Sequence, residues 1–187
     1  MEQPRVLVAI TSYNRQDQLI NLCASLQDDE HQSIIPDIAV FDDCTPSLTI
    51  FRGPGIKLIQ SAEHRGKAGF WKTYNDIFAY CKEHDYDYYI ILPDDVEPCP
   101  NFVEKAIEAY DKAGCICLSP LLTNRSLLPG ISRWGMKPIV LRDWGYETSY
   151  FDCAGIMKRD FFEALNWHML PILPSSNPFR SSGVGRQ

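Results

Sequence analysis

The chain has 187 residues, of which 45% are hydrophobic and 22% are charged, as is typical of a folded globular domain. This length allows one domain with a sizeable core and is too short for two ordinary domains. The formal net charge is −6 and no run of lysine or arginine occurs. The composition therefore does not suggest a nucleic-acid partner bound through an extended basic face, and it leaves a local basic patch open.

The seven cysteines are scattered and include no CxxC pair. This usage argues against a disulfide framework or a zinc site and favours a reducing compartment. The apolar run at residues 6–10 is too short for a signal peptide, and no segment approaches the roughly 20 apolar residues of a membrane span. We therefore expect a cytoplasmic protein without a membrane span.

Strands and helices are expected to alternate along the first 120 residues. Apolar runs predict strands at residues 6–10, 38–41, 56–59, 88–92 and 116–118. Apolar stripes at helical spacing predict helices after the first, third and fourth strands. The last of these covers residues 102–110, with Asn101 and Glu104 as a capping box. A later strand-like piece at 149–157 precedes a helix at 159–165. This order predicts a parallel α/β sheet.

Polar residues directly follow three of the predicted strands. They are residues 11–15 after the first strand, Asp42 and Asp43 after the second, and Asp94 and Asp95 after the fourth. In a parallel sheet these ends share one edge, which is where open α/β sheets bind ligands. Adjacent carboxylates repel each other unless a cation lies between them, and a divalent cation is the usual solution. One such pair alone is more often turn chemistry, but three clusters together predict a ligand site.

Two common nucleotide-binding motifs are missing. No GxGxxG follows the first strand, which disfavours a dinucleotide-dependent dehydrogenase, and no GxxxxGK[ST] occurs. The segment Arg65-Gly66-Lys67 after the third strand lacks the required glycine spacing. If this edge binds a phosphate, we expect a metal and the Arg and Lys side chains to hold it instead of a glycine-rich loop.

Taken in order, these segments resemble a glycosyltransferase of the GT-A fold, closest in style to the family 2 enzymes. The resemblance covers residues 5–110 well and the rest loosely. It rests on Thr11-x-Tyr13-Asn14-Arg15, Phe41-Asp42-Asp43, His64-Arg65-Gly66-Lys67-Ala68-Gly69 and Leu92-Pro93-Asp94-Asp95. It implies a single α/β domain of the GT-A type, a mostly parallel sheet flanked by helices. Residues 1–120 would be the nucleotide-sugar-binding half and residues 121–187 the acceptor-facing half.

The resemblance also implies roles for individual residues. The residues expected to bind the donor are Thr11, Tyr13, Arg15, Asp42, Asp43, Arg65, Gly66, Lys67 and Asp94. Asp95 is the expected ligand of Mn²⁺ or Mg²⁺, with Asp94 either beside it on the metal or on the ribose. A strict DXD motif would have aspartate at Pro93, so this chain offers a variant of that motif.

The catalytic base is left open by the sequence. Inverting members of the family place a carboxylate in the acceptor half, yet residues 166–187 contain none. His168 is the one residue there that titrates near neutrality. The base is therefore Asp152, another earlier acid, His168 or a group beyond residue 187, or the enzyme retains configuration and needs none. The chain is short for this family, and we expect a truncated or unusually minimal domain.

The implied activity is transfer of a sugar from a nucleotide donor, a UDP-sugar, to a hydroxyl acceptor near Trp134, Trp144 and Asp152. The acceptor classes are glycans, proteins and small molecules, with modified nucleic acid ranked last. One alternative is a nucleotidyltransferase, but its usual Gly- and Arg-rich opening loop is not matched by residues 10–15, which contain no glycine. Another is a catalytically silent nucleotide-sugar binder, which the missing late carboxylate favours.

Overall fold

The computed structural model describes most of the first 118 residues and three later segments. The described residues are 3–28, 30, 32–46, 48, 55–115, 117–118, 140–142, 145–147 and 154–169. Their elements are β1 (Val6–Ser12), α1 (Gln16–Leu26), β2 (Asp37–Asp42), β3 (Ile56–Gln60), α2 (Gly66–Glu83), β4 (Tyr88–Pro93), α3 (Phe102–Ala113), β5 (Cys117–Leu118), β6 (Val140–Arg142), β7 (Gly145–Glu147), β8 (Gly155–Met157) and α5 (Arg159–Ala164). No helix within these ranges is long and apolar enough to cross a membrane.

Six strands form one sheet in the order β3-β2-β1-β4-β8-β5. β1 pairs in parallel with both β2 and β4, and β3 pairs in parallel with β2. β8 runs antiparallel to β4, and β5 runs antiparallel to β8. The predicted mostly parallel α/β sheet is therefore confirmed. β6 and β7 form a separate antiparallel pair.

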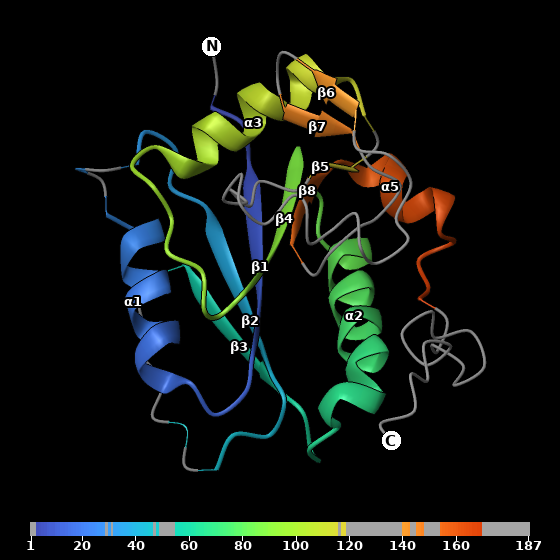
Figure 1. Cartoon of the computed structure of the whole chain (residues 1–187). Helices are drawn as coiled ribbons and strands as arrows, with labels where there is room; N and C mark the ends of the chain where they lie inside the picture. Colours follow the sequence, from blue (N-terminus) through green and yellow to red (C-terminus); the bar gives the residue numbers. More distant parts are fainter. Residues whose placement is uncertain are drawn as a thin grey trace, which may run out of the picture.

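Helices cover both faces of the sheet, α1 and α3 on one face and α2 and α5 on the other (Figure 1). Successive residues of β1 alternate between these two layers. Val6, Val8 and Ile10 pack with α1 and α3, whereas Leu7 and Ala9 pack with α2 and α5. Because side chains of a strand point to opposite faces in turn, a strand covered on both faces needs an unbroken apolar run.

The order of the strands creates a switch point between β1 and β4. From β1 the chain moves outward to β2 and β3 on one side, and it then returns to β4 on the other side. Sheets of this kind bind ligands outside the carboxyl ends of the strands at such a point. This edge lies in the lower part of Figure 1, where α1 and α2 begin.

The predicted capping box at the start of α3 is wrong. Asn101 adopts a left-handed backbone conformation with φ of 56° and makes no side-chain cap hydrogen bond. Its Oδ1 instead accepts a hydrogen bond from the backbone N–H of Ser33 at 3.1 Å, and Glu104 accepts one from the Ser33 hydroxyl. The two side chains therefore hold the loop between α1 and β2, a long-range contact that local spacing does not reveal.

Candidate functional site

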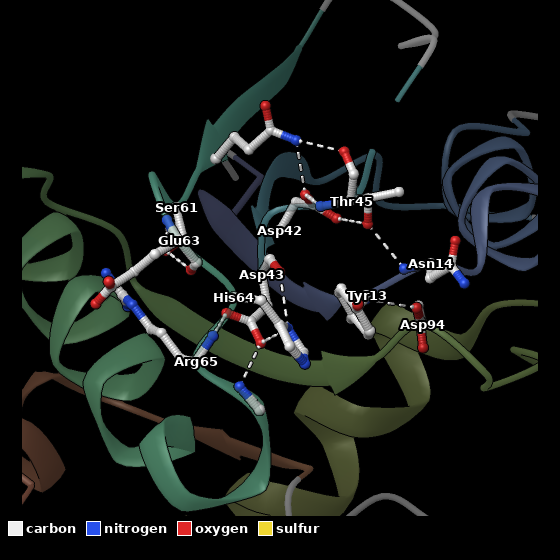
Figure 2. A network of polar contacts seen from close by, with 12 residues as sticks. Tyr13, Asn14, Asp42, Asp43, Thr45, Ser61, Glu63, His64, Arg65 and Asp94 are labelled. Carbon is white, nitrogen blue, oxygen red and sulfur yellow. Dashed lines mark hydrogen bonds and ion pairs between the residues drawn. The ribbon is translucent and has the colours of Figure 1, made fainter. Parts of the chain in front are cut away.

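The carboxyl ends of β1, β2 and β4 are joined by backbone hydrogen bonds that extend beyond the regular strand pairing. The N–H of Asp94 donates to the carbonyl of Thr11 at 3.1 Å, and the N–H of Asp43 donates to the carbonyl of Ser12 at 2.8 Å. Side chains from the loops after these strands then meet in one polar network (Figure 2). The expected convergence of the three polar clusters at one edge is therefore observed.

Asp94 is a buried carboxylate that anchors the loop between β1 and α1. Its Oδ2 accepts hydrogen bonds from the Ser12 hydroxyl at 2.8 Å and the Tyr13 backbone N–H at 3.4 Å. Its Oδ1 faces Nη1 of Arg15 at 3.1 Å, and its side chain is 5% exposed. Burial of a charged carboxylate is tolerated only with such partners. Asp94 therefore fixes the geometry of this edge.

Asp95 is the exposed partner of Asp94. Its side chain is 52% exposed, and its Oδ2 lies 2.6 Å from Nη1 of Arg15. The same nitrogen therefore contacts both carboxylates. The hydrogen bond to Asp94 is the largest of the effects that raise the pKa of the Arg15 guanidinium, and the charges of Asp94 and Asp95 act in the same direction. A permanent cation thus stands between the paired acids.

Asp43 caps the start of α2 from a neighbouring loop. Its Oδ1 accepts from the N–H of Arg65 at 2.8 Å and its Oδ2 from the N–H of Gly66 at 2.9 Å. The first N–H groups of a helix lack partners within the helix, and a carboxylate there is also favoured by the helix dipole. Gly66 has φ of +58°, a conformation that glycine adopts without strain. Asp43 and Gly66 together fix the direction in which α2 leaves the site.

An aromatic stack links the first and third loops of the site. The rings of Tyr13 and His64 lie with centroids 3.9 Å apart and planes inclined by 18°. His64 Nδ1 also lies 2.9 Å from Oδ2 of Asp43, so the carboxylate that caps α2 holds this ring. Tyr13 remains 40% exposed. The stack presents a flat aromatic surface near Asp94 (Figure 2).

Asp42 holds the loop after β2. It accepts hydrogen bonds from the N–H and hydroxyl of Thr45 and from Nε2 of Gln60 at 2.9 Å, and it is 2% exposed. The Thr45 hydroxyl in turn accepts from the backbone N–H of Asn14 at 2.7 Å. Asp42 is therefore surrounded by donors of the protein itself, and it supports the loops around the site.

Three more residues expected at the donor are Arg65, Lys67 and Thr11, which lie at the start of α2 and the end of β1. The Arg65 guanidinium extends along α2 to Asp76, with Nη1 and Oδ2 2.6 Å apart, and is 17% exposed. Gly69 makes room for it, because an added Cβ there would lie 2.7 Å from the Arg65 Cβ. Lys67 is exposed in the first turn of α2 and forms no ion pair with another described residue. Thr11 is buried at the end of β1.

Of the two expected catalytic residues, the structure describes His168, which lies outside this network. Asp152 lies outside the described residues, as do Trp134 and Trp144. His168 is exposed after α5, next to Met169. The backbone of Met169 exchanges two hydrogen bonds with the side chain of Asn75, at 2.6 and 3.1 Å, beside the middle of α2. His168 therefore lies along α2 instead of at its start.

The sequence interpretation missed four members of the network. They are Ser12, Thr45, Gln60 and His64, which hold Asp94, Asp42 and Asp43. Ser12 and Gln60 are the last residues of β1 and β3, so a closer look at strand ends would have found them. His64 stands in the segment that carries the resemblance but is not among the residues expected to bind the donor, and the structure shows that it contacts two loops of the site at once.

The paired acids match a divalent cation in the chemistry of their donors. Carboxylate oxygens are what Mg²⁺ and Mn²⁺ prefer, and Mg²⁺ is commonly held by one or two carboxylates with phosphate and water oxygens completing its shell. No group of three or more His, Cys, Asp or Glu side chains within the described ranges could hold a metal without such help. Arg15 stands in for the cation between Asp94 and Asp95. The residues thus fit a metal that arrives with a phosphate-bearing ligand.

Comparison with solved structures decides the fold. S. aureus TarS matches with a TM-score of 0.62 at 15% identity over 90% of this chain. The mannosyltransferase PcManGT from Pyrobaculum calidifontis, in complex with GDP-Man and Mn²⁺, matches with a TM-score of 0.62 at 16% identity over 95%. The fold is the GT-A glycosyltransferase fold. The present chain spans 31% of the length of the TarS chain and 51% of the length of the PcManGT chain.

A third match is residues 1–349 of S. aureus TarS in complex with UDP-GlcNAc. It has a TM-score of 0.56 at 13% identity and covers 87% of this chain, which spans 47% of it. No protein-family model matches the sequence, and no curated protein sequence is similar to it. The GT-A assignment therefore rests on the arrangement of strands and helices. It agrees with the fold that the resemblance of the strand-end segments predicted.

Proposed function

We propose that this chain is a glycosyltransferase domain that transfers a sugar from a nucleotide donor, a UDP-sugar, to a hydroxyl acceptor with the help of Mn²⁺ or Mg²⁺. The observation that carries the proposal is the placement of Asp94 and Asp95 at the switch point between β1 and β4 of a GT-A fold. Neighbours of the same fold bind UDP-GlcNAc, or GDP-Man with Mn²⁺, which supports a nucleotide-sugar donor.

The chemical task of the site is to stabilise a leaving nucleoside diphosphate. A bound metal supplies Lewis-acid neutralisation of the charge that develops there. The half-exposed Asp95 would hold this metal, and the buried Asp94 would keep Asp95 and the first loop in position. Lys67 would contact the phosphates, because its ammonium is exposed at the start of α2 and unpaired within the described part of the chain. Arg65 is less available, since its guanidinium is paired with Asp76.

The nucleoside would bind over the loops after β1 and β2. The exposed ring of Tyr13 would stack with the base, since stacking of a base on an aromatic side chain is favourable for every base. Asp42 and Asp43 would act through the loops that they hold, because their oxygens already accept several hydrogen bonds. These assignments place the donor at the carboxyl edge and leave the acceptor to the second half of the chain.

The acceptor side of the proposal follows from the sequence. The hydroxyl acceptor, a glycan, protein or small molecule, would lie near Trp134 and Trp144, with Asp152 as the first candidate base. His168 is the second candidate, and its exposed imidazole lies on a segment that Asn75 fastens to α2. Reaching a substrate at the start of α2 from there requires a rearrangement of this segment, so Asp152 is tested first.

The test is a product assay with UDP-sugars and GDP-Man in the presence of Mn²⁺ and, as a control, of EDTA. A glycosyltransferase domain is expected to release the nucleoside diphosphate slowly, because water takes the place of the acceptor. Release of pyrophosphate from a nucleoside triphosphate and a sugar phosphate would identify a nucleotidyltransferase. Binding of the nucleotide-sugar by calorimetry without release of either product would identify a silent binder and contradict the proposed activity.

A further inference from the structure

We infer that Arg15 is a built-in counter-ion of Asp94 and Asp95, which a divalent cation must displace and which the phosphates of the donor then bind. The inference rests on the proposed function and describes how its metal site is regulated. Without donor, the guanidinium keeps the affinity of the acids for metal low. With donor, the phosphates offer Arg15 another anionic partner, so metal and donor bind together.

The geometry shows why the guanidinium and a metal exclude each other. Nη1 of Arg15 lies 3.1 Å from Oδ1 of Asp94 and 2.6 Å from Oδ2 of Asp95. A Mg²⁺ ion bound to these two oxygens at about 2.1 Å from each would occupy the space of this nitrogen. The two cations would also repel each other at that distance. Metal binding between the acids therefore requires the side chain of Arg15 to leave.

The surroundings of Arg15 allow that movement without a change in the backbone. Its carbonyl accepts the N–H of Leu19 at 3.0 Å in the first turn of α1, so the main chain is fixed. Its side chain is 47% exposed, and within the described part of the chain its ion pairs are those with Asp94 and Asp95. Asp94, in contrast, is 5% exposed and is also held by the Ser12 hydroxyl and the Tyr13 backbone N–H. The guanidinium can therefore leave the acids while Asp94 keeps its other partners.

A phosphate group is the natural second partner for this side chain. Guanidinium groups bind phosphate through two parallel hydrogen bonds from two nitrogens. In the present contact a single nitrogen of Arg15 faces oxygens of two different carboxylates, so this bidentate geometry is not formed. A donor whose diphosphate approaches Asp95 would therefore draw Arg15 away and add its own oxygens to the metal. By thermodynamic linkage, each of the two ligands then raises the affinity of the site for the other.

The experiment measures Mn²⁺ binding without nucleotide, by electron paramagnetic resonance of the free ion. Arg15→Gln is expected to bind Mn²⁺ about fivefold more tightly than the wild-type chain, the size expected for loss of an exposed ion pair. Arg15→Lys, which keeps the charge, should stay within about twofold of the wild type. Asp95→Asn in the Arg15→Gln background should remove the gain. Arg15→Met serves in place of Arg15→Gln if thermal unfolding shows that the glutamine variant does not fold.

A second titration measures the coupling with nucleotide. Saturating UDP should tighten Mn²⁺ binding more in the wild-type chain than in Arg15→Gln, because only the wild type has a guanidinium to redirect. Equal Mn²⁺ affinity in the two chains would overturn the role of Arg15, while loss of binding in Asp95→Asn would still uphold the metal assignment. Absence of Mn²⁺ binding from all the chains, with UDP bound normally, would overturn both the metal assignment and this inference.

Discussion

The two edges of the parallel sheet use acidic side chains in different ways. At the amino edge, Asp37 accepts from the Tyr86 hydroxyl at 2.9 Å and Asp87 accepts from the N–H of Arg5 at 2.7 Å. Each of these acids completes a local contact between neighbouring elements. At the carboxyl edge, Asp94 is enclosed by donors, and Asp95 beside it remains half exposed. The acids of the amino edge are both exposed, whereas the carboxyl edge places a buried acid directly beside an exposed one.

The aromatic residues of the two edges show the same contrast. At the amino edge, cations cover the rings: Lys57 lies 4.9 Å from the Tyr80 ring centroid, and Arg5 lies 4.8 Å from that of Tyr86. A hollow of about 280 Å³ there is lined by these tyrosines together with Asp37. At the carboxyl edge, Tyr13 stacks on His64 and is still 40% exposed. Tyr13 is thus more exposed than Tyr80 and Tyr86, and its ring is the one better placed for a planar ligand.

Removal of the exposed acid is expected to have the largest effect. Asp95→Asn should lower Mn²⁺-dependent release of the nucleoside diphosphate at least about 100-fold, because it removes the proposed metal ligand. Thermal unfolding should be nearly unchanged, since this side chain is half exposed. Glu108→Gln removes an exposed charge from α3 and is the matched control. Equal loss of activity in both variants would show that net charge, and not the carboxyl edge, determines metal binding.

Removal of the buried acid should act on stability first. Asp94→Ala leaves the Ser12 hydroxyl without its acceptor and Arg15 without one of its two partners. We expect the free energy of unfolding, measured in urea, to fall by about 2 kcal/mol. Asp87→Ala at the amino edge provides the comparison, because it removes one acceptor of the Arg5 N–H from an exposed position. A larger loss for Asp87→Ala would reverse the proposed difference between the two edges.

The fold was largely predictable because apolar runs and helical stripes report burial directly. The apolar run of β4 is unbroken because both faces of this strand are covered. The acids that directly follow it therefore lie at the edge of the sheet. The partners of those acids were not predictable. Arg15, which the resemblance places at the donor, bridges Asp94 and Asp95, a contact made across 79 and 80 positions of the chain. Side-chain directions over such separations depend on the assembled sheet.

The loop after β3 shows a second limit of sequence reasoning. Arg65 and Lys67 stand two positions apart and carry the same charge, so both were expected at the phosphates. In the structure Arg65 reaches Asp76 on the same helix, and Lys67 remains exposed. Helical spacing does not predict this ion pair between positions eleven apart, because it depends on the space that Gly69 leaves beside the Arg65 stem. Which of two equal charges is available is decided by packing.

Two glycines share a left-handed backbone conformation, but only one of them lies at the candidate site. Comparing alanine variants of the two distinguishes an effect on stability from an effect on ligand binding. Gly66 at the start of α2 has φ of +58°, and Gly114 after α3 has φ of +60°. Alanine at either position should lower the free energy of unfolding by about 1 kcal/mol, the cost of a left-handed conformation for a residue with a Cβ. An added Cβ would lie 3.4 Å from Nε2 of His64 at Gly66 and would meet nothing within 4 Å at Gly114.

Calorimetry with UDP then distinguishes the two variants. Gly66→Ala is expected to weaken UDP binding severalfold, because the added Cβ would press on the His64 ring, which Asp43 holds and on which Tyr13 stacks. Gly114→Ala should bind UDP as the wild-type chain does. Weaker binding in both variants to the same extent would mean that general destabilisation, and not the geometry of the α2 start, controls the donor site.

The smallest effect is expected from a tyrosine of the amino edge. Burial, followed by the hydrogen bond to Asp37, raises the pKa of the Tyr86 hydroxyl above its ordinary value. The folded chain therefore holds this proton more tightly than the unfolded chain, so the contribution of Tyr86 to stability is complete below about pH 10 and is lost as the pH rises further. Tyr86→Phe should lower stability at pH 8 by about 1 kcal/mol, since the hydrogen bond to Asp37 is lost.

The pH dependence of unfolding in urea sharpens the contrast between the edges. The difference in stability between the wild-type chain and Tyr86→Phe should shrink above pH 10, because the wild type then loses the contribution that the variant lacks. UDP binding at pH 8 should be the same in both, since Tyr86 faces the amino edge and contacts Asp37 at the start of β2. A change in UDP affinity would show that the two edges are coupled through the sheet, and the division of roles between them would then have to be abandoned.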